Sequence, residues 1–98
     1  MPAYTVLDVD WHDEGKAAEY RKLFGPALEK HGGRTLAANV PKVLEGEWRP
    51  PRIVILEFPT MAALLGWYNS PEHAPLMRLR NEGATSRMIA VERPPAPP

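Results

Sequence analysis

Apolar and polar positions alternate near the N-terminus, and this alternation predicts a first strand over Tyr4–Asp10. Side chains along a strand point alternately to its two faces, so Leu7 and Val9 share one face while Val6 and Asp8 share the other. We therefore expect one face to be apolar and the opposite face to carry an acidic side chain.

Helical periodicity follows this strand. Asp13 is placed to cap a helix, and apolar positions then recur at helical spacing. The positions that share this stripe are Ala17, Tyr20, Phe24, Ala27, Leu28 and His31. Gly25 and Pro26 interrupt the stripe, so we expect the helix to be kinked or split there. Gly32 and Gly33 predict its end, because glycine adopts the left-handed conformation without strain.

The next segment predicts an interrupted second strand. It starts at Arg34–Asn39, is broken by Val40-Pro41 and continues through Lys42–Trp48, and a turn follows at Arg49–Pro51. A proline inside a strand is compatible only with a sheet edge or a bulge. We therefore expect this strand to lie at the edge of the sheet.

The clearest strand is Arg52–Phe58, which is apolar on both faces. Alternation places Val54 and Leu56 on one face and Ile55 and Glu57 on the other. Both faces are expected to be covered. Glu57 is the only charged residue inside this run, so its position is informative.

Two helical segments and a strand complete the chain. Thr60 is expected to cap a helix over Met61–Tyr68, and Ser70-Pro71-Glu72 begins a further helical segment. Pro75 lies within that segment, so we expect a distortion there. Arg87–Glu92 predicts the last strand.

The order β-α-β-β-α-β is the split βαβ pattern and predicts a ferredoxin-like α+β fold. We expect one domain over residues 1–93 and a proline-rich, extended or disordered tail over 94–98. In this fold the sheet is four-stranded and antiparallel, with the first and third strands in the centre and the helices on one face. The other face is apolar and open, so it needs a partner.

Composition narrows the function classes. The chain has 98 residues and no net charge, which argues against nucleic-acid binding, and no apolar run approaches the roughly 20 residues that span a membrane. The N-terminus has neither the basic nor the apolar region of an export signal, so a cytoplasmic location is expected. Cysteine is absent, which excludes disulfides and thiolate catalysis. A domain this small, without disulfide or structural metal, is expected to form a homodimer.

Several segments taken in order resemble one family. These segments are His31–Arg34, Val43–Trp48, Glu57–Pro59, Trp67–Glu72 and the single residue Arg80. The set resembles the domain of unknown function 1330, within the dimeric α/β-barrel superfamily. The resemblance implies a ferredoxin-like protomer and a dimer whose two sheets face each other, forming a dimeric α/β barrel, but no agreed activity.

The wider superfamily includes cofactor-free monooxygenases, haem-degrading enzymes, lactone isomerases and stress-responsive proteins, so the fold does not select a reaction. This chain departs from the family pattern at two places. It has Ala38-Asn39-Val40 where the family often has Arg-Gly-Gly, and His73 where the family usually has tyrosine. A role that depends on that basic residue or that phenol does not carry over to this protein.

Glu57 is the leading candidate for chemistry, with His31 and Arg34 as helpers. A carboxylate in an apolar cavity would have a raised pKa and act as a general acid or base. Alternatively, Glu57 pairs with Arg34 and stabilises the dimer. His31 is a candidate proton shuttle or a cation at the negative end of its helix. Arg34 is expected to bind an anion or to pair with Glu57 or Glu45.

Trp48, Glu45 and Arg80 are the candidate ligand-binding residues, with Trp48 near a strand end where its ring would face a ligand. Trp67 and Tyr68 are expected to pack in the core. No phosphate loop, dinucleotide fingerprint, nucleophile elbow or repeated metal-ligand spacing is present, so neither cofactor nor metal is expected. Two hypotheses remain: a small-molecule-binding dimer that acts as a cofactor-free enzyme, or a non-catalytic binding or stress-related module.

Overall fold

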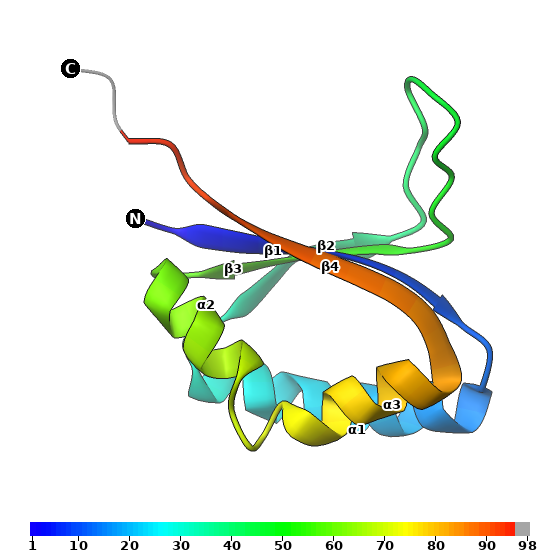
Figure 1. The fold of residues 1–98 in the computed structure, drawn as a ribbon, viewed down its shortest axis with the longest axis horizontal. Coiled ribbons are helices and arrows are strands. Elements are labelled where there is room, and N and C mark those ends of the chain that lie inside the picture. Colours follow the sequence, from blue (N-terminus) through cyan, green and yellow to red (C-terminus); the bar gives the residue numbers. More distant parts are fainter. Residues whose placement is uncertain (96–98) are drawn as a thin grey trace.

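The structure is a computed structural model that describes residues 1–95, so part of the predicted tail at 94–98 lies outside the described residues. The elements in chain order are β1 (Ala3–Trp11), α1 (Glu14–Lys30), β2 (Arg34–Asn39), β3 (Ile53–Phe58), α2 (Met61–Tyr68), α3 (Ala74–Gly83) and β4 (Ala84–Glu92). The strands form one antiparallel sheet in the order β2-β3-β1-β4. All three helices lie on one side of this sheet (Figure 1). The predicted ferredoxin-like fold, with the first and third strands central, is confirmed. None of the helices within residues 1–95 is long and apolar enough to cross a membrane.

The core lies between the sheet and the helices. Leu56 and Phe58 of β3 are buried there together with Trp67 of α2, whose ring centroid lies 5.2 Å from that of Phe58. Burial of these side chains removes the largest apolar surfaces of the chain from water and fixes α2 on the sheet. The prediction that Trp67 packs in the core is confirmed.

Helix α1 begins and ends where the sequence indicates. The Asp13 carboxylate accepts a hydrogen bond of 3.0 Å from the backbone N–H of Lys16, and Gly32 beyond the helix has φ +76°. The helix runs unbroken through Pro26, so of the two predicted outcomes, a kink or a split, the split is wrong. The buried residues Ala27 and Leu28 follow the proline directly, and their packing holds the last turn in place.

The predicted continuation of the second strand through Lys42–Trp48 is wrong. Residues 40–52, called here the 40–52 loop, form no strand, and they project from the sheet on its helix-free side (Figure 1). Pro41 cannot donate to a strand ladder, and Gly46 has φ +85°, which is not an extended conformation. Within residues 1–95 the sheet ends at β2, so this segment also has no further strand with which it could pair.

The helical segment after Ser70 also differs from expectation. The Ser70 hydroxyl accepts a hydrogen bond from the backbone N–H of His73, which closes a turn, and α3 begins only at Ala74. Pro75 therefore lies in the first turn, where a missing N–H has no helical partner to lose. Hence the distortion expected at Pro75 is not found.

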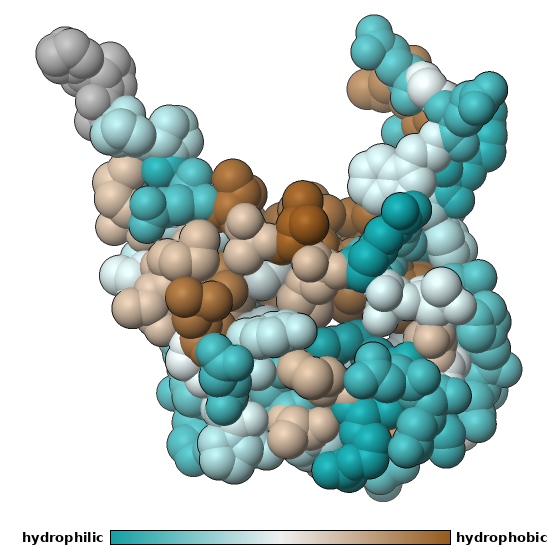
Figure 2. All heavy atoms as spheres, viewed as in Figure 1, coloured by the Kyte–Doolittle hydropathy of each residue, from teal (hydrophilic) through white to brown (hydrophobic). Residues whose placement is uncertain are grey.

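The helix-free side of the sheet, called here the open face, has an apolar row at its centre, formed by Ile55, Val6 and Ile89 across three strands, with polar and charged side chains toward both ends. Its members, which share a side by their cross-strand register, are Tyr4, Val6, Asp8, Asp10, Arg34, Ala37, Asn39, Ile53, Ile55, Glu57, Thr85, Arg87, Ile89 and Val91. Ile89 is 66% exposed and Val91 is 52% exposed. Figure 2 shows this apolar surface as a hollow between the 40–52 loop and the C-terminal segment. Within one chain, β3 is thus covered on only one of its two faces.

Candidate functional site

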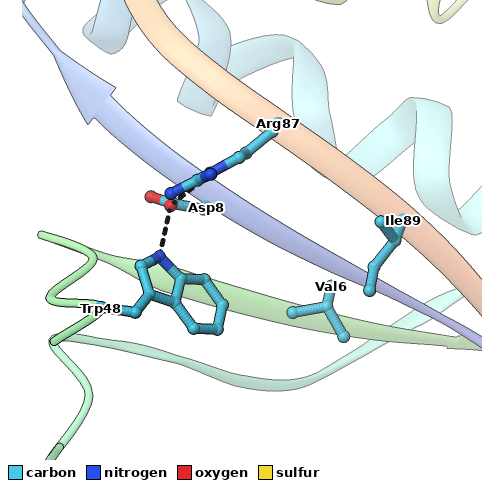
Figure 3. A pocket seen from close by; sticks show the side chains of 5 residues that line it. All are labelled: Val6, Asp8, Trp48, Arg87 and Ile89. Carbon is cyan, nitrogen blue, oxygen red and sulfur yellow. Dashed lines mark hydrogen bonds and ion pairs between the residues drawn. The ribbon is translucent and has the colours of Figure 1, made fainter. Parts of the chain in front are cut away.

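A single carboxylate organises the pocket on the open face. The Asp8 Oδ2 atom accepts hydrogen bonds of 3.1 Å from the Trp48 indole Nε1–H and 3.1 Å from the Arg87 Nε–H (Figure 3). The Arg87 guanidinium carbon lies 5.7 Å from the centroid of the Trp48 ring, within the range of a cation–π contact. These three side chains come from β1, β4 and the 40–52 loop.

Strand register explains how two of the three residues meet. Asp8 and Arg87 are direct partners on the neighbouring strands β1 and β4, so their side chains leave the sheet side by side. The Asp8 side chain is 12% exposed, whereas the Arg87 side chain is 73% exposed. The carboxylate is thus shielded under its two donors, and the cation faces water. Trp48 lies where the 40–52 loop returns to the sheet, and from there its side chain extends toward the pair (Figure 3).

The pocket around these residues has a volume of about 410 Å³. Val6 and Ile89 form its apolar side, opposite the Trp48 ring (Figure 3). Asp8 and Arg87 cancel each other's charge, so the site is neutral overall. A flat apolar ring fits against Trp48 by stacking, and the Arg87 N–H groups that Asp8 does not use are available to a polar substituent.

The predicted pair of Glu57 and Arg34 lies on the open face, toward the opposite end of the strands. The Arg34 Nε–H donates a hydrogen bond of 2.7 Å to Glu57 Oε1, and the two residues are register partners on β2 and β3. The Arg34 hydrogen bond lowers the pKa of the Glu57 carboxyl, and this effect outweighs the opposing effect of desolvation. The alternative in which Glu57 forms an ion pair is therefore the one observed. A carboxylate with a lowered pKa is a weak general base.

His31 does not join that pair. Its Nε2 atom lies 3.6 Å from the Glu72 Oε2 atom, and Lys30 also binds Glu72. The Lys30 hydrogen bond is the largest of the effects that lower the pKa of Glu72 to about 2. Among residues 1–95, no hydrogen bond or ion pair links His31 to Glu57. Of the three predicted catalytic residues, Arg34 and Glu57 are bonded to each other, whereas His31 is paired with Glu72.

Arg80 lies inside the helical layer and is 4% exposed. Its guanidinium donates to the Tyr20 hydroxyl at 3.0 Å and to His73 Nε2 at 3.2 Å. Burial lowers the pKa of His73 to about 4, so this ring is neutral at pH 7. Burial also raises the pKa of the Tyr20 phenol. Arg80 and Trp48 thus lie on different sides of the sheet.

Glu45 is exposed in the 40–52 loop, and within the described part of the chain it makes no hydrogen bond or ion pair.

Asp8 and Arg87 were not among the predicted site residues. The available signal was the acidic side chain on the otherwise apolar side of the first strand. Within the same described residues, no three His, Asp or Glu side chains are grouped as metal ligands.

Comparisons with known proteins identify the fold group. A family model described as "Domain of unknown function (DUF1330)" matches residues 2–94. A protein of unknown function from Rhodopseudomonas palustris is 22% identical with a TM-score of 0.75, over 98% of this chain and 84% of that chain. A dimeric ferredoxin-like protein of unknown function from Jannaschia sp. CCS1 is 16% identical with a TM-score of 0.72, over 95% of this chain and 100% of that chain.

SnoaB, a cofactor-independent oxygenase from Streptomyces nogalater, is 14% identical with a TM-score of 0.60, over 99% of this chain and 97% of that chain. At these identities the likeness concerns the fold and not the activity. No curated protein matches the chain.

Proposed function

The chain belongs to the DUF1330 family, and from this premise we propose that it is a homodimeric protein that binds a small molecule in the open-face pocket. The ligand lies against Trp48, beside the paired Asp8 and Arg87, and a second copy of the chain covers the open face. The observation that carries this proposal is one shielded carboxylate that holds an indole and a guanidinium over an uncovered apolar sheet.

The extent of exposed surface supports the dimer. The chain has an accessible surface of 6468 Å², whereas a compact monomer of 11.0 kDa is expected to expose roughly 5,600 Å². Part of the excess comes from the projecting 40–52 loop, in which Leu44 is 85% exposed. A contiguous apolar surface of this kind is typical of an interface. The dimeric protein from Jannaschia sp. CCS1 has the same fold.

Charge pairing on the open face also favours a second copy of the chain. The face carries the ion pair of Asp8 with Arg87 and the ion pair of Arg34 with Glu57, with Val6 and Ile89 among its apolar members. Because the members of these two pairs already neutralise each other, a second copy can cover them without isolating either charge, whereas Asp10 at the end of the strands forms no ion pair within residues 1–95 and is exposed. The same two pairs in the facing copy would surround an apolar centre.

The chemistry of the pocket selects a planar, uncharged molecule with one polar substituent. The aromatic face of Trp48 and the aliphatic side chains of Val6 and Ile89 favour a flat apolar body. The remaining N–H donors of Arg87 favour a hydroxyl or carbonyl oxygen on that body. A full negative charge is disfavoured because the nearby Asp8 carboxylate repels it.

The proposal is tested with 2-naphthol, which is planar, uncharged at pH 7 and carries one hydroxyl. Trp48→Phe first identifies the Trp48 indole N–H signal in a ¹H–¹⁵N spectrum. We expect 2-naphthol to shift this signal saturably in the native protein. Asp8→Asn weakens binding, because the indole and the guanidinium lose their common charged acceptor.

The matched control is Asp10→Asn, which removes an exposed carboxylate from the same strand and leaves the affinity unchanged. A Trp48 signal that does not respond to 2-naphthol would contradict the proposed site. Equal affinity in the native protein and the Asp8→Asn variant would contradict the role of the carboxylate.

A further inference from the structure

We propose that the protein has a second binding site, on the helix side of the sheet, for a small hydrophobic carboxylate. The site is a cleft of about 470 Å³ between α1 and the strands β1, β2 and β3, called here the helix-side cleft. This volume falls within the range of small-molecule pockets. The cleft is distinct from the open-face pocket, and it favours a negatively charged ligand, whereas that pocket favours an uncharged one.

The packing of the helices leaves this cleft open. Helix α1 packs chiefly against α3, and all six residues of β2 are exposed. The sheet on the helix side is therefore uncovered toward its β2 edge. The apolar lining includes Leu7 of β1, Val54 of β3, Trp11 at the end of β1 and Phe24 of α1. These side chains form a continuous surface for the body of an apolar ligand.

Two arginines line this apolar cleft, and both are exposed. Among residues 1–95, Arg52 forms no ion pair, and Arg21 reaches only Glu14 at a distance of 4.0 Å. Two cations beside an apolar surface complement a molecule with an apolar body and an anionic head. A carboxylate matches the planar fork of a guanidinium in two parallel hydrogen bonds, so a carboxylate is the head group that we infer.

The sheet separates the two sites. Leu7 points into the helix-side cleft, whereas Val6 and Asp8 point to the open face. A substitution in one site therefore leaves the lining of the other intact. The open-face pocket is neutral because Asp8 and Arg87 are paired, but the helix-side cleft is cationic. The two sites are thus expected to prefer ligands of different charge.

The test measures the affinity of the helix-side cleft in the full chain for sodium 2-naphthoate and for its uncharged relative 2-naphthylmethanol at pH 7. The readout is the indole N–H signal of Trp11, which lines this cleft, because the alcohol also fits the open-face pocket and calorimetry would report both sites together. We expect the acid to bind about three- to tenfold more tightly than the alcohol in the native protein, as for a partly solvated charge-assisted pair. Arg21 lies beside Glu14, whereas Arg52 has no ion-pair partner within residues 1–95, so Arg52 is the arginine inferred to hold the carboxylate. Arg52→Gln therefore abolishes this preference, and Arg52→Lys keeps part of it because the charge remains.

A second variant tests the position of the ligand. Ala38 pairs with Val54 across β2 and β3, so its side chain faces the cleft at an exposed position. Ala38→Phe fills the cleft and removes binding of the acid, while circular dichroism confirms that the fold is retained. Asp8→Asn serves as the control and leaves the affinity for 2-naphthoate unchanged.

Three results would overturn the second site. They are equal affinity for the acid and the alcohol, an acid preference that survives Arg52→Gln, and a loss of 2-naphthoate binding in Asp8→Asn. The last result would assign the carboxylate to the open-face pocket. Binding of 2-naphthol at Trp48 is measured separately. The open-face proposal can therefore fail while the helix-side proposal holds, and the helix-side proposal can fail while the open-face proposal holds.

Discussion

His73 makes the stability of this protein depend on pH. The side chain is 0% exposed; its Nδ1 atom lies 2.9 Å from the Tyr68 carbonyl oxygen, and its Nε2 atom lies 3.2 Å from the Arg80 guanidinium. The carbonyl is only an acceptor and the guanidinium only a donor, so the ring is neutral with its proton on Nδ1. A second proton would have to lie against the Arg80 cation.

The magnitude follows from the difference between folded and unfolded pKa values. Burial, with Arg80 as a further cause, lowers the pKa of His73 from 6.5 to about 4. Below pH 6.5 the unfolded chain binds a proton that the folded chain does not bind, so stability falls as the pH falls from 6.5 toward 4. The full shift corresponds to about 3 kcal/mol. We discount this figure to about 2 kcal/mol because water screens charges in a domain this small.

The assay is urea denaturation at pH 7 and at pH 4.5, at one fixed protein concentration. His73→Gln preserves one donor and one acceptor but does not titrate, so this variant should lose most of the difference between the two pH values. The control is His12→Gln, which changes an exposed side chain and keeps the difference. Glu57 and Glu72 do not interfere, because their pKa values are lowered and their contributions are lost only below about pH 4.5. Equal pH dependence in His73→Gln and the native protein would refute the reasoning.

Two further predictions follow from local geometry. Gly33→Ala should destabilise the fold by about 1–3 kcal/mol, because the new methyl carbon would lie 2.7 Å from the Phe58 ring, whereas Gly66→Ala meets no atom within 4 Å and should stabilise α2 by about 0.5–1 kcal/mol. Thermal melts check both, and equal shifts would contradict this packing. Arg34→Ala should raise the pKa of the Glu57 carboxyl, since the Arg34 hydrogen bond is the main cause that lowers it. A carboxyl ¹³C titration measures this pKa, and an unchanged value would show that the ion pair does not form.

Local patterns were sufficient to predict the fold. The alternation in β1 and β3 determines which side chains face the helices, and the Asp13 and Thr60 side chains cap α1 and α2 as expected. The open face followed from the element order, because a ferredoxin-like chain has helices for only one side of its sheet. These features depend on contacts between residues that are close in sequence or fixed by regular strand pairing.

The errors arose where a segment's structure depends on what lies beside it. The residues from 42 to 48 have strand-like composition, but the edge of the sheet offers them no partner strand. The pairing of Arg34 with Glu57 was predictable because antiparallel register places the two strand ends together. The Asp8 site was not predictable, because the contact of the Trp48 ring with Asp8 depends on the conformation of the 40–52 loop. Spacing alone also did not reveal that Arg80 is enclosed by Tyr20 and His73.

The central claim is that a second copy of this chain covers the open face, and sedimentation equilibrium at micromolar concentration tests it most directly. We expect the native protein to sediment at twice the chain mass of 11.0 kDa. Ile89→Glu should sediment as a monomer, because it places an unpaired charge at a position that is 66% exposed in the single chain. The control, Leu65→Glu on α2, alters a side chain that is 48% exposed on the helix side and should remain dimeric. A native protein of 11.0 kDa, or an Ile89→Glu variant that is still dimeric, would contradict the account.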